Sequence, residues 1–379
     1  MSQMSQMSQP SSQFKAVGPT SNHWTELPSW DEFLRKMGKD PSRYLGLTRD
    51  VSFILHHLAT VAVARDSAPW LRAIKDRAFR RAIDQLNLDD GKTRAVAMPE
   101  IEAKNGKLAH ADFMAACDYY QKPLIVRGWF AGARALKEWS PDGLPKYVGS
   151  QEIPCVIRDS KKFNKDRVTM TVKEYCDTVK RGETIYLSGE MALTKPGSPL
   201  LPLLELDRFD PETQASLEMS RLYVFGGLSR RTGTAMHCGE YSSVFYCVAG
   251  KKRWKMLRPD YNPVMNPIAS KFYSRLILAD GYEGCEEIED LERYWSQYSF
   301  LPHYVGDIEA GDLIVVPGWW WHHVENLGEE FTIGVDLDTI YHYPNENKLL
   351  TYTVRSDLSP IRKRFSPWEK NRLARQGVA

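Results

Sequence analysis

Two histidine-containing segments decide how this chain is expected to fold. The first reads Thr234-Ala235-Met236-His237-Cys238-Gly239-Glu240, and the second reads Pro317-Gly318-Trp319-Trp320-Trp321-His322-His323-Val324. Two strand-borne histidines far apart in sequence, with a carboxylate two residues after the first, form the facial iron site of non-haem oxygenases. Here Gly239 occupies the carboxylate position. The pattern therefore predicts an iron site on a β-scaffold that lacks one protein ligand.

Short apolar segments separated by Gly and Pro turns surround both histidines. We expect strands over residues 122–128, 153–157, 184–188, 220–225, 243–249, 253–257, 312–316 and 331–337. Strands of this length and spacing indicate a barrel or a jelly roll. Helical patterns begin at Ser29-Trp30, cover 51–63 and 70–88, and return at 110–121. The predicted fold class is mainly β with helical additions.

Composition limits the classes of protein to which the chain can belong. Its 379 residues, 42% hydrophobic and 26% charged, are typical of a soluble globular protein. A net charge of +2 is too small to create an overall electrostatic field that would attract a nucleic acid or a membrane surface. No run of apolar residues reaches membrane-spanning length. Six cysteines without CxxC spacing favour a reducing compartment. With a polar N-terminus in place of a signal peptide, this predicts a cytoplasmic protein.

Changes in composition divide the chain into four expected parts. Residues 1–22 are rich in Ser, Gln and Met, which is typical of disorder. Residues 23–104 form a helical N-terminal region, residues 105–345 the catalytic domain, and residues 346–379 a basic tail with a helix.

The second segment contains two adjacent histidines. Neighbouring residues on a strand point to opposite faces, so His322 and His323 cannot both reach one metal ion easily. We assign His322 as the ligand, at the edge of an aromatic run that suits a dry metal pocket.

Three stretches together resemble the JmjC/cupin-type Fe(II)- and 2-oxoglutarate-dependent oxygenases. They are Thr234-x-x-His237, then Val248-Ala249-Gly250-Lys251-Lys252-Arg253-Trp254, and Gly311-Asp312 through Trp320-Trp321-His322. The resemblance covers roughly residues 105–345 and is greatest to the subgroup containing the asparaginyl hydroxylase of hypoxia-inducible factor. It implies a double-stranded β-helix with iron at its mouth.

The resemblance also implies roles for individual residues. His237 and His322 match the iron ligands, and Lys252 matches the lysine that pairs with the distal carboxylate of 2-oxoglutarate. A buried cation there is chemically sensible, because an unpaired dicarboxylate inside a barrel is strongly desolvated. Thr234 and Tyr186 match hydroxyl donors to the same carboxylate. The implied cofactors are Fe(II), 2-oxoglutarate and O2. Asp336 falls near a family position that carries a polar group beside the iron, although its spacing differs.

The glycine at position 239 leaves three interpretations open. The first, which we expect, is a radical halogenase acting on an amino acid or natural-product intermediate, with chloride in the vacated position. The second is a hydroxylase of a small molecule or a protein side chain, with water or Glu240 completing the site. Glu240 is three residues from His237 and points to the opposite face of a regular strand unless a bulge turns it inward. The third is a non-catalytic binding protein.

Overall fold

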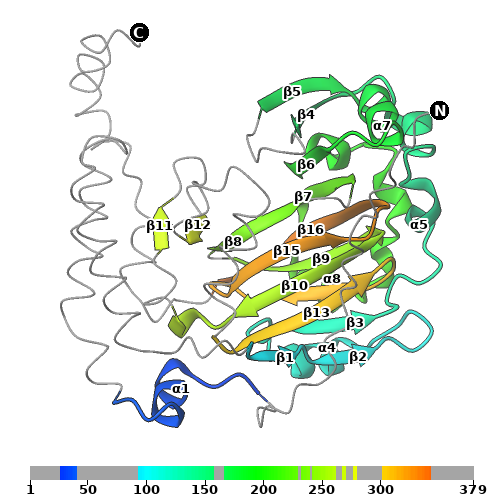
Figure 1. Ribbon diagram of the computed structural model, residues 1–379. Coiled ribbons are helices and arrows are strands. Elements are labelled where there is room, and N and C mark those ends of the chain that lie inside the picture. The colour runs from blue at the N-terminus through cyan, green and yellow to red at the C-terminus, as the bar shows by residue number, and fades with distance from the viewer. Residues whose placement is uncertain are drawn as a thin grey trace, which may run out of the picture.

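The computed structural model describes residues 26–40, 93–157, 166–228, 232–239, 241–261, 267–269, 276–279 and 301–342. Two β-sheets dominate this part of the chain, and helices α1, α5 and α7 lie around them (Figure 1). The fold is mainly β, with the two sheets arranged as a double-stranded β-helix, as the sequence predicts. None of the helices in the described ranges combines the length and the hydropathy needed to cross a membrane.

Both histidine segments contribute strands to the smaller sheet. Its described strands are, in spatial order, β1 (Ala95–Ala97), β13 (His303–Glu309), β10 (Lys251–Leu257), β15 (Trp321–Leu327), β8 (Gly233–Gly239), β12 (Leu276–Ala279) and β11 (Pro267–Ala269). His237 lies on β8 and His322 on the adjacent β15. The sheet therefore joins two segments that are far apart in sequence.

The larger sheet faces the smaller one across the barrel interior. Its described strands are β2 (Glu100–Glu102), β3 (Leu124–Arg127), β14 (Leu313–Val316), β9 (Tyr241–Ala249), β16 (Phe331–His342), β7 (Leu217–Leu228), β6 (Ile185–Glu190), β4 (Glu152–Ile157) and β5 (Asp166–Thr171). Strands thus cover each segment for which the sequence predicts one, with differences at the ends.

The central strands of the larger sheet are buried on both faces. On β9, Val244 and Tyr246 belong to a core cluster shared with the helices, whereas Phe245 and Cys247 belong to a cluster between the sheets. Successive side chains on a strand alternate between faces, so a strand covered on both sides reads as a continuous apolar run. On β16 the same alternation directs Asp336 toward the barrel interior.

The described helices are α1 (Trp30–Lys36), α4 (His110–Cys117), α5 (Ala135–Glu138), α6 (Leu144–Val148), α7 (Val172–Lys180) and α8 (Pro211–Ala215), with 3-10 turns η2 (Ala192–Thr194), η3 (Leu201–Leu203), η4 (Leu206–Arg208) and η5 (Pro259–Tyr261). Ser29 caps α1 through a reciprocal capping box with Glu32, at the predicted helix start. Trp30 packs edge-on against Tyr261 at 5.4 Å between ring centroids. This contact attaches α1 to the turn after β10.

The helix expected over 110–121 is shorter than predicted. It ends at Cys117, because Asp118 and Tyr119 both adopt left-handed backbone conformations, with φ of 49° and 52°. The expected helices at 51–63 and 70–88, the segment 1–22 and the tail 346–379 lie outside the described residues.

Candidate active site

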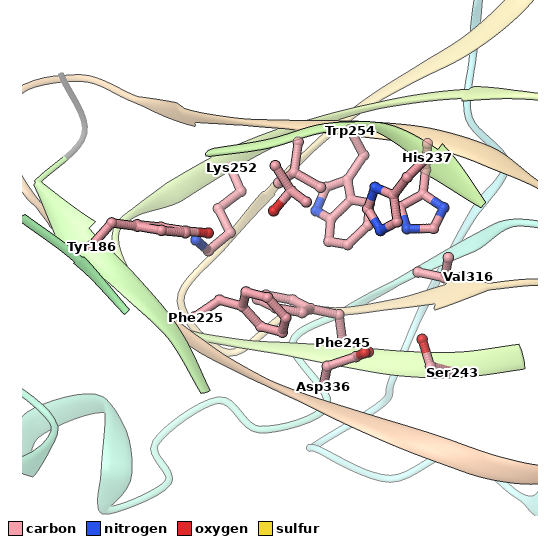
Figure 2. Close-up of a pocket in the computed structure, with 12 residues that line it drawn as sticks. Tyr186, Phe225, His237, Ser243, Phe245, Lys252, Trp254, Val316 and Asp336 are labelled. Atoms are coloured by element: carbon pink, nitrogen blue, oxygen red, sulfur yellow. The ribbon is translucent and has the colours of Figure 1, made fainter. Parts of the chain in front are cut away.

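A pocket between the two sheets contains most of the predicted site residues (Figure 2). The smaller sheet contributes Thr234, His237, Lys252, Trp254, His322 and Val324, and the larger sheet contributes Tyr186, Phe225, Ser243, Phe245, Val316 and Asp336. These residues are inward-facing members of their strands, so the pocket is the interior of the barrel. Their direction follows from the alternation of side chains along each strand except β8, where a shift in the pairing with β15 brings Thr234 and His237 to the same face.

His237 and His322 lie directly opposite each other on adjacent antiparallel strands. Their ring centroids are 4.0 Å apart and the ring planes are inclined by 59°. His322 Nδ1 lies 2.9 Å from the carbonyl oxygen of Trp320. A carbonyl only accepts, so Nδ1 carries the proton and Nε2 keeps the lone pair that a metal needs. Burial lowers the pKa of His322 well below its ordinary value, and His237 adds to this effect.

His323 lies outside the pocket lining, as strand alternation predicts. Its Nδ1 is 3.5 Å from Glu325 Oε1, and Glu325 also pairs with Lys255. Burial lowers the pKa of His323 to about 4. His323 thus belongs to a charged cluster on the other face of the smaller sheet.

Lys252 places a buried cation at the other end of the pocket. The residue is 1% exposed, and its Nζ donates a hydrogen bond of 2.7 Å to Oδ1 of Asn326. Nζ also lies 5.6 Å from the ring centroid of Phe245. Burial lowers the pKa of Lys252 to about 8. Figure 2 shows Tyr186 and Lys252 pointing toward each other, away from His237.

Gly239 is the last residue of β8 and is not among the residues lining the pocket. Its carbonyl oxygen accepts a hydrogen bond of 2.6 Å from the backbone N–H of Trp319. Glu240, the rival ligand, lies outside the described residues. Within the described ranges no group of three or more His, Cys, Asp or Glu side chains could hold a metal ion. The described metal donors are therefore two imidazoles.

Asp336 lies on the larger sheet, across the pocket from His237 (Figure 2). Burial raises its pKa to about 8, the charge of Asp338 adds to this, and a hydrogen bond from Ser243 opposes it. Its Oδ1 is shielded from solvent and has no hydrogen-bond partner among the described residues. The sequence alone indicates Asp336 only as a possible neighbour of the iron, and the structure places it in the same pocket as both histidines.

Several residues of the pocket could not be identified from the sequence. Phe225, Phe245 and Trp254 supply apolar surface around Lys252 and the histidines. Asn326 does not line the pocket but contacts Lys252, and no sequence pattern identifies it, because its role depends on its place opposite Lys252 in the pairing of β10 with β15. An inward-facing aromatic on an alternating strand is the usual pattern of a core residue, so spacing alone does not distinguish these positions.

The residues present fit the groups that the sequence implies. Two neutral imidazoles facing each other suit a divalent transition metal, with the remaining coordination positions left to other ligands. The ammonium of Lys252 has an amide as its partner, and no carboxylate of the described residues pairs with it. A buried cation of this kind calls for an anionic ligand. Fe(II) at the histidines and a carboxylate of 2-oxoglutarate at Lys252 meet both requirements.

Comparisons with known proteins agree with this fold. The model of the Cupin-like domain family matches residues 111–337. Arginine-specific demethylase JMJ22 of Arabidopsis thaliana is 23% identical over 246 residues, which are 59% of this chain and 43% of the relative. The chain thus spans less than half the length of this distant JmjC relative. Because the family model covers more than half of the 379 residues, the chain belongs to the Cupin-like domain family.

Proposed function

We propose that this protein is an Fe(II)- and 2-oxoglutarate-dependent oxygenase that hydroxylates a C–H bond of its substrate. The observation that carries the proposal is the arrangement of one pocket: a pair of facing histidines at one end and a buried lysine at the other. A dicarboxylate that chelates a metal at one end and pairs with a cation at the other would join these two features of the pocket. Neither feature has an evident structural purpose inside an apolar barrel, where both are costly to bury.

Each residue has a defined task in this proposal. His237 and His322 hold the metal through ring nitrogens, and the bond from His322 Nδ1 to Trp320 sets the tautomer that leaves Nε2 available. Lys252 binds the distal carboxylate of the cosubstrate, assisted by the hydroxyl groups of Tyr186 and Thr234. When bound, iron and 2-oxoglutarate would supply the oxidation of the C–H bond by O2, with one oxygen atom going to the substrate and the other to succinate, and with carbon dioxide released.

The aromatic side chains of the pocket exclude water from the reacting groups. Phe245 and Trp254 meet edge-on at 5.3 Å, and Trp254 lies 5.9 Å from the ring of His322. A dry environment strengthens the charged contacts that orient the cosubstrate and limits side reactions. The substrate in this proposal is a protein side chain or a small molecule, and the relative named above is described as a demethylase of arginine.

Halogenation is the second candidate, and Gly239 is the observation that favours it. No side chain from this position competes for the metal, so chloride has a place to bind. The relative is named as a demethylase and not as a halogenase, which makes oxygen transfer our first choice. The two reactions share every binding residue and differ only in the atom transferred to the substrate.

Anaerobic titration of the purified protein with Fe(II) and 2-oxoglutarate tests the proposal. We expect a visible charge-transfer absorption band when both are present, loss of the band in His322→Ala, and a normal band in His323→Ala. On admission of oxygen, 2-oxoglutarate should be converted to succinate. A protein that binds neither Fe(II) nor 2-oxoglutarate would instead be a non-catalytic binding protein. A chlorinated or brominated product in the presence of halide would select the second candidate.

A further inference from the structure

We infer that Asn326 is a positioning residue that prepares Lys252 for an anionic ligand: its neutral amide holds the ammonium in place without cancelling its charge. The inference rests on the proposed function, because it concerns the same cosubstrate site. It adds a specificity determinant that accounts for why a dicarboxylate, and not a carboxylate of the protein itself, pairs with Lys252.

A continuous chain of hydrogen bonds runs from the pocket to the end of β7. Lys252 and Asn326 stand directly opposite each other on β10 and β15. The Lys252 ammonium donates to Asn326 Oδ1 at 2.7 Å, and Asn326 Nδ2 donates to the hydroxyl oxygen of Thr232 at 2.6 Å. The Thr232 hydroxyl in turn donates to the carbonyl oxygen of Leu228. All three side chains are buried.

Chemistry permits this chain to run in one direction only. An ammonium group has no acceptor, so the amide must present its oxygen to Lys252 and its NH2 to Thr232. The Thr232 hydroxyl donates its hydrogen to the carbonyl oxygen of Leu228, so toward Asn326 its oxygen acts as the acceptor. The orientation of the amide is thus determined at both ends. A side chain held this firmly keeps the Lys252 ammonium at one point of the pocket.

The neutrality of the amide matters as much as its position. A carboxylate at position 326 would form a buried ion pair with Lys252 and satisfy its charge inside the protein. The amide supplies one hydrogen bond and leaves the positive charge uncompensated in an apolar environment. An arriving carboxylate then gains the full strength of a charge-assisted contact. Burial lowers the pKa of Lys252, and no carboxylate of the described residues offsets this effect.

The isosteric variant Asn326→Asp is the decisive experiment. It preserves shape and the contact with Lys252 but adds the internal negative charge. It also replaces the NH2 that donates to Thr232 by an acceptor oxygen, toward which the Thr232 hydroxyl must turn its hydrogen. We expect its affinity for 2-oxoglutarate, measured anaerobically at pH 7 with Mn(II) in place of iron, to fall by about tenfold or more, a loss of about 1.4 kcal/mol. Asn105→Asp adds the same charge at an exposed turn and should bind 2-oxoglutarate as the wild type does.

A second readout is independent of 2-oxoglutarate. In the wild type the pKa of Lys252 in the folded protein, about 8, is below its ordinary value of 10.5. The unfolded chain therefore binds more protons between these values, and this lysine makes stability increase as pH rises through that interval. In Asn326→Asp the new carboxylate raises the folded pKa of Lys252. The difference in stability between variant and wild type should therefore shift against the variant as pH rises from about 8 to about 10.

The outcomes separate this inference from the proposed function. If Lys252→Met binds 2-oxoglutarate as tightly as the wild type, the cosubstrate site itself is wrong. If Lys252→Met binds weakly and Asn326→Asp binds normally, only the role of Asn326 fails. Should Asn326→Asp not fold, Thr232→Val keeps every charge but removes the acceptor for the Asn326 NH2, so that the amide oxygen is no longer held in place beside Lys252. That variant should weaken 2-oxoglutarate binding, and unchanged affinity would overturn the inference.

Discussion

The backbone N–H of Trp319 donates a hydrogen bond of 2.6 Å to the carbonyl oxygen of Gly239. This bond joins the end of β8, which carries His237, to the turn that precedes β15, which carries His322. Trp319 is buried and adopts a left-handed conformation with φ of 66°, which is unfavourable for a bulky residue. Gly318, next to it, donates to the Ser242 hydroxyl at 2.9 Å. A backbone hydrogen bond thus connects β8 to the turn before β15 at Gly239, the position where the family pattern has a carboxylate.

The first prediction concerns the two adjacent histidines. His322→Ala should abolish Fe(II) binding, because it removes one of the two imidazoles that face each other in the pocket. His323→Ala should leave Fe(II) affinity within about a factor of three, since His323 lies beside Glu325 outside the pocket lining. Anaerobic calorimetry with Fe(II) or Mn(II) measures both. The reverse pattern would exchange the assignments.

Lys252→Met should weaken 2-oxoglutarate binding while metal binding survives. A buried contact between a cation and a carboxylate is worth about 3 kcal/mol, so we expect a loss of roughly a hundredfold. Methionine keeps the length of the side chain and suits the neighbouring ring of Phe245. Titration of the Mn(II)-loaded protein with 2-oxoglutarate measures the effect, and Lys251→Met, at an exposed position of the same strand, is the matched control.

Binding of 2-oxoglutarate should weaken as pH rises above about 8, the pKa of Lys252 in the folded protein. Below this pH the ammonium is charged and available; above it, binding must first restore the proton. Asp336, with a pKa of about 8, ionises over the same interval and adds a negative charge to the pocket, which acts in the same direction. His322 stays neutral throughout, because its pKa is lowered.

The variant Asp336→Asn separates these two titrations. It should keep a decline of about tenfold in affinity per pH unit, the slope expected from loss of one proton at Lys252. The wild type should decline more steeply than this variant. An affinity that does not change between about pH 7 and about pH 9.5 in both proteins would show that neither group titrates in contact with the cosubstrate.

Gly239→Asp should supply the missing third ligand. Residues two apart on a strand share a face, so the new carboxylate lies on the side of β8 that carries His237. The backbone bond from Trp319 to position 239 is unaffected by the side chain. We expect Fe(II) to bind about tenfold more tightly or better, and any effect of chloride on the Fe(II) spectrum to disappear. Gly239→Ala, which adds no ligand, is the control; equal affinities of the two variants would contradict the expectation.

Much of the site could be predicted because strand alternation is a local property. Alternation would place Thr234 and His237, three residues apart, on opposite faces of β8, and both line the pocket because the pairing of β8 with β15 shifts register between them. The same rule places His322 and His323 on opposite sides of the smaller sheet. Glu240 shows the limit of the rule: its direction depends on the path of the chain beyond the end of β8, which alternation does not decide.

The remaining features depend on which strands become neighbours. Asn326 contacts Lys252 because β10 pairs with β15 in one register. A slip of β15 by one residue would turn every side chain of that strand to the other face of the sheet and bring His323 to the pocket side. Asp336 is enclosed with both histidines because the larger sheet closes over the smaller one. Burial is the largest cause of its raised pKa, and the nearby charge of Asp338 contributes less.

The sequence by itself determined the β-rich fold, the two histidines and the absent carboxylate at Gly239, since residue identity and a period of two suffice for each. The tertiary structure decided which charged side chains form ion pairs and which are buried beside a neutral partner. Lys251 and Lys252 are adjacent and chemically identical, yet Lys251 forms an exposed ion pair with Glu309 whereas Lys252 is buried against Asn326. Desolvation and partners arise only when distant strands pack together, and they determine the chemistry of the site.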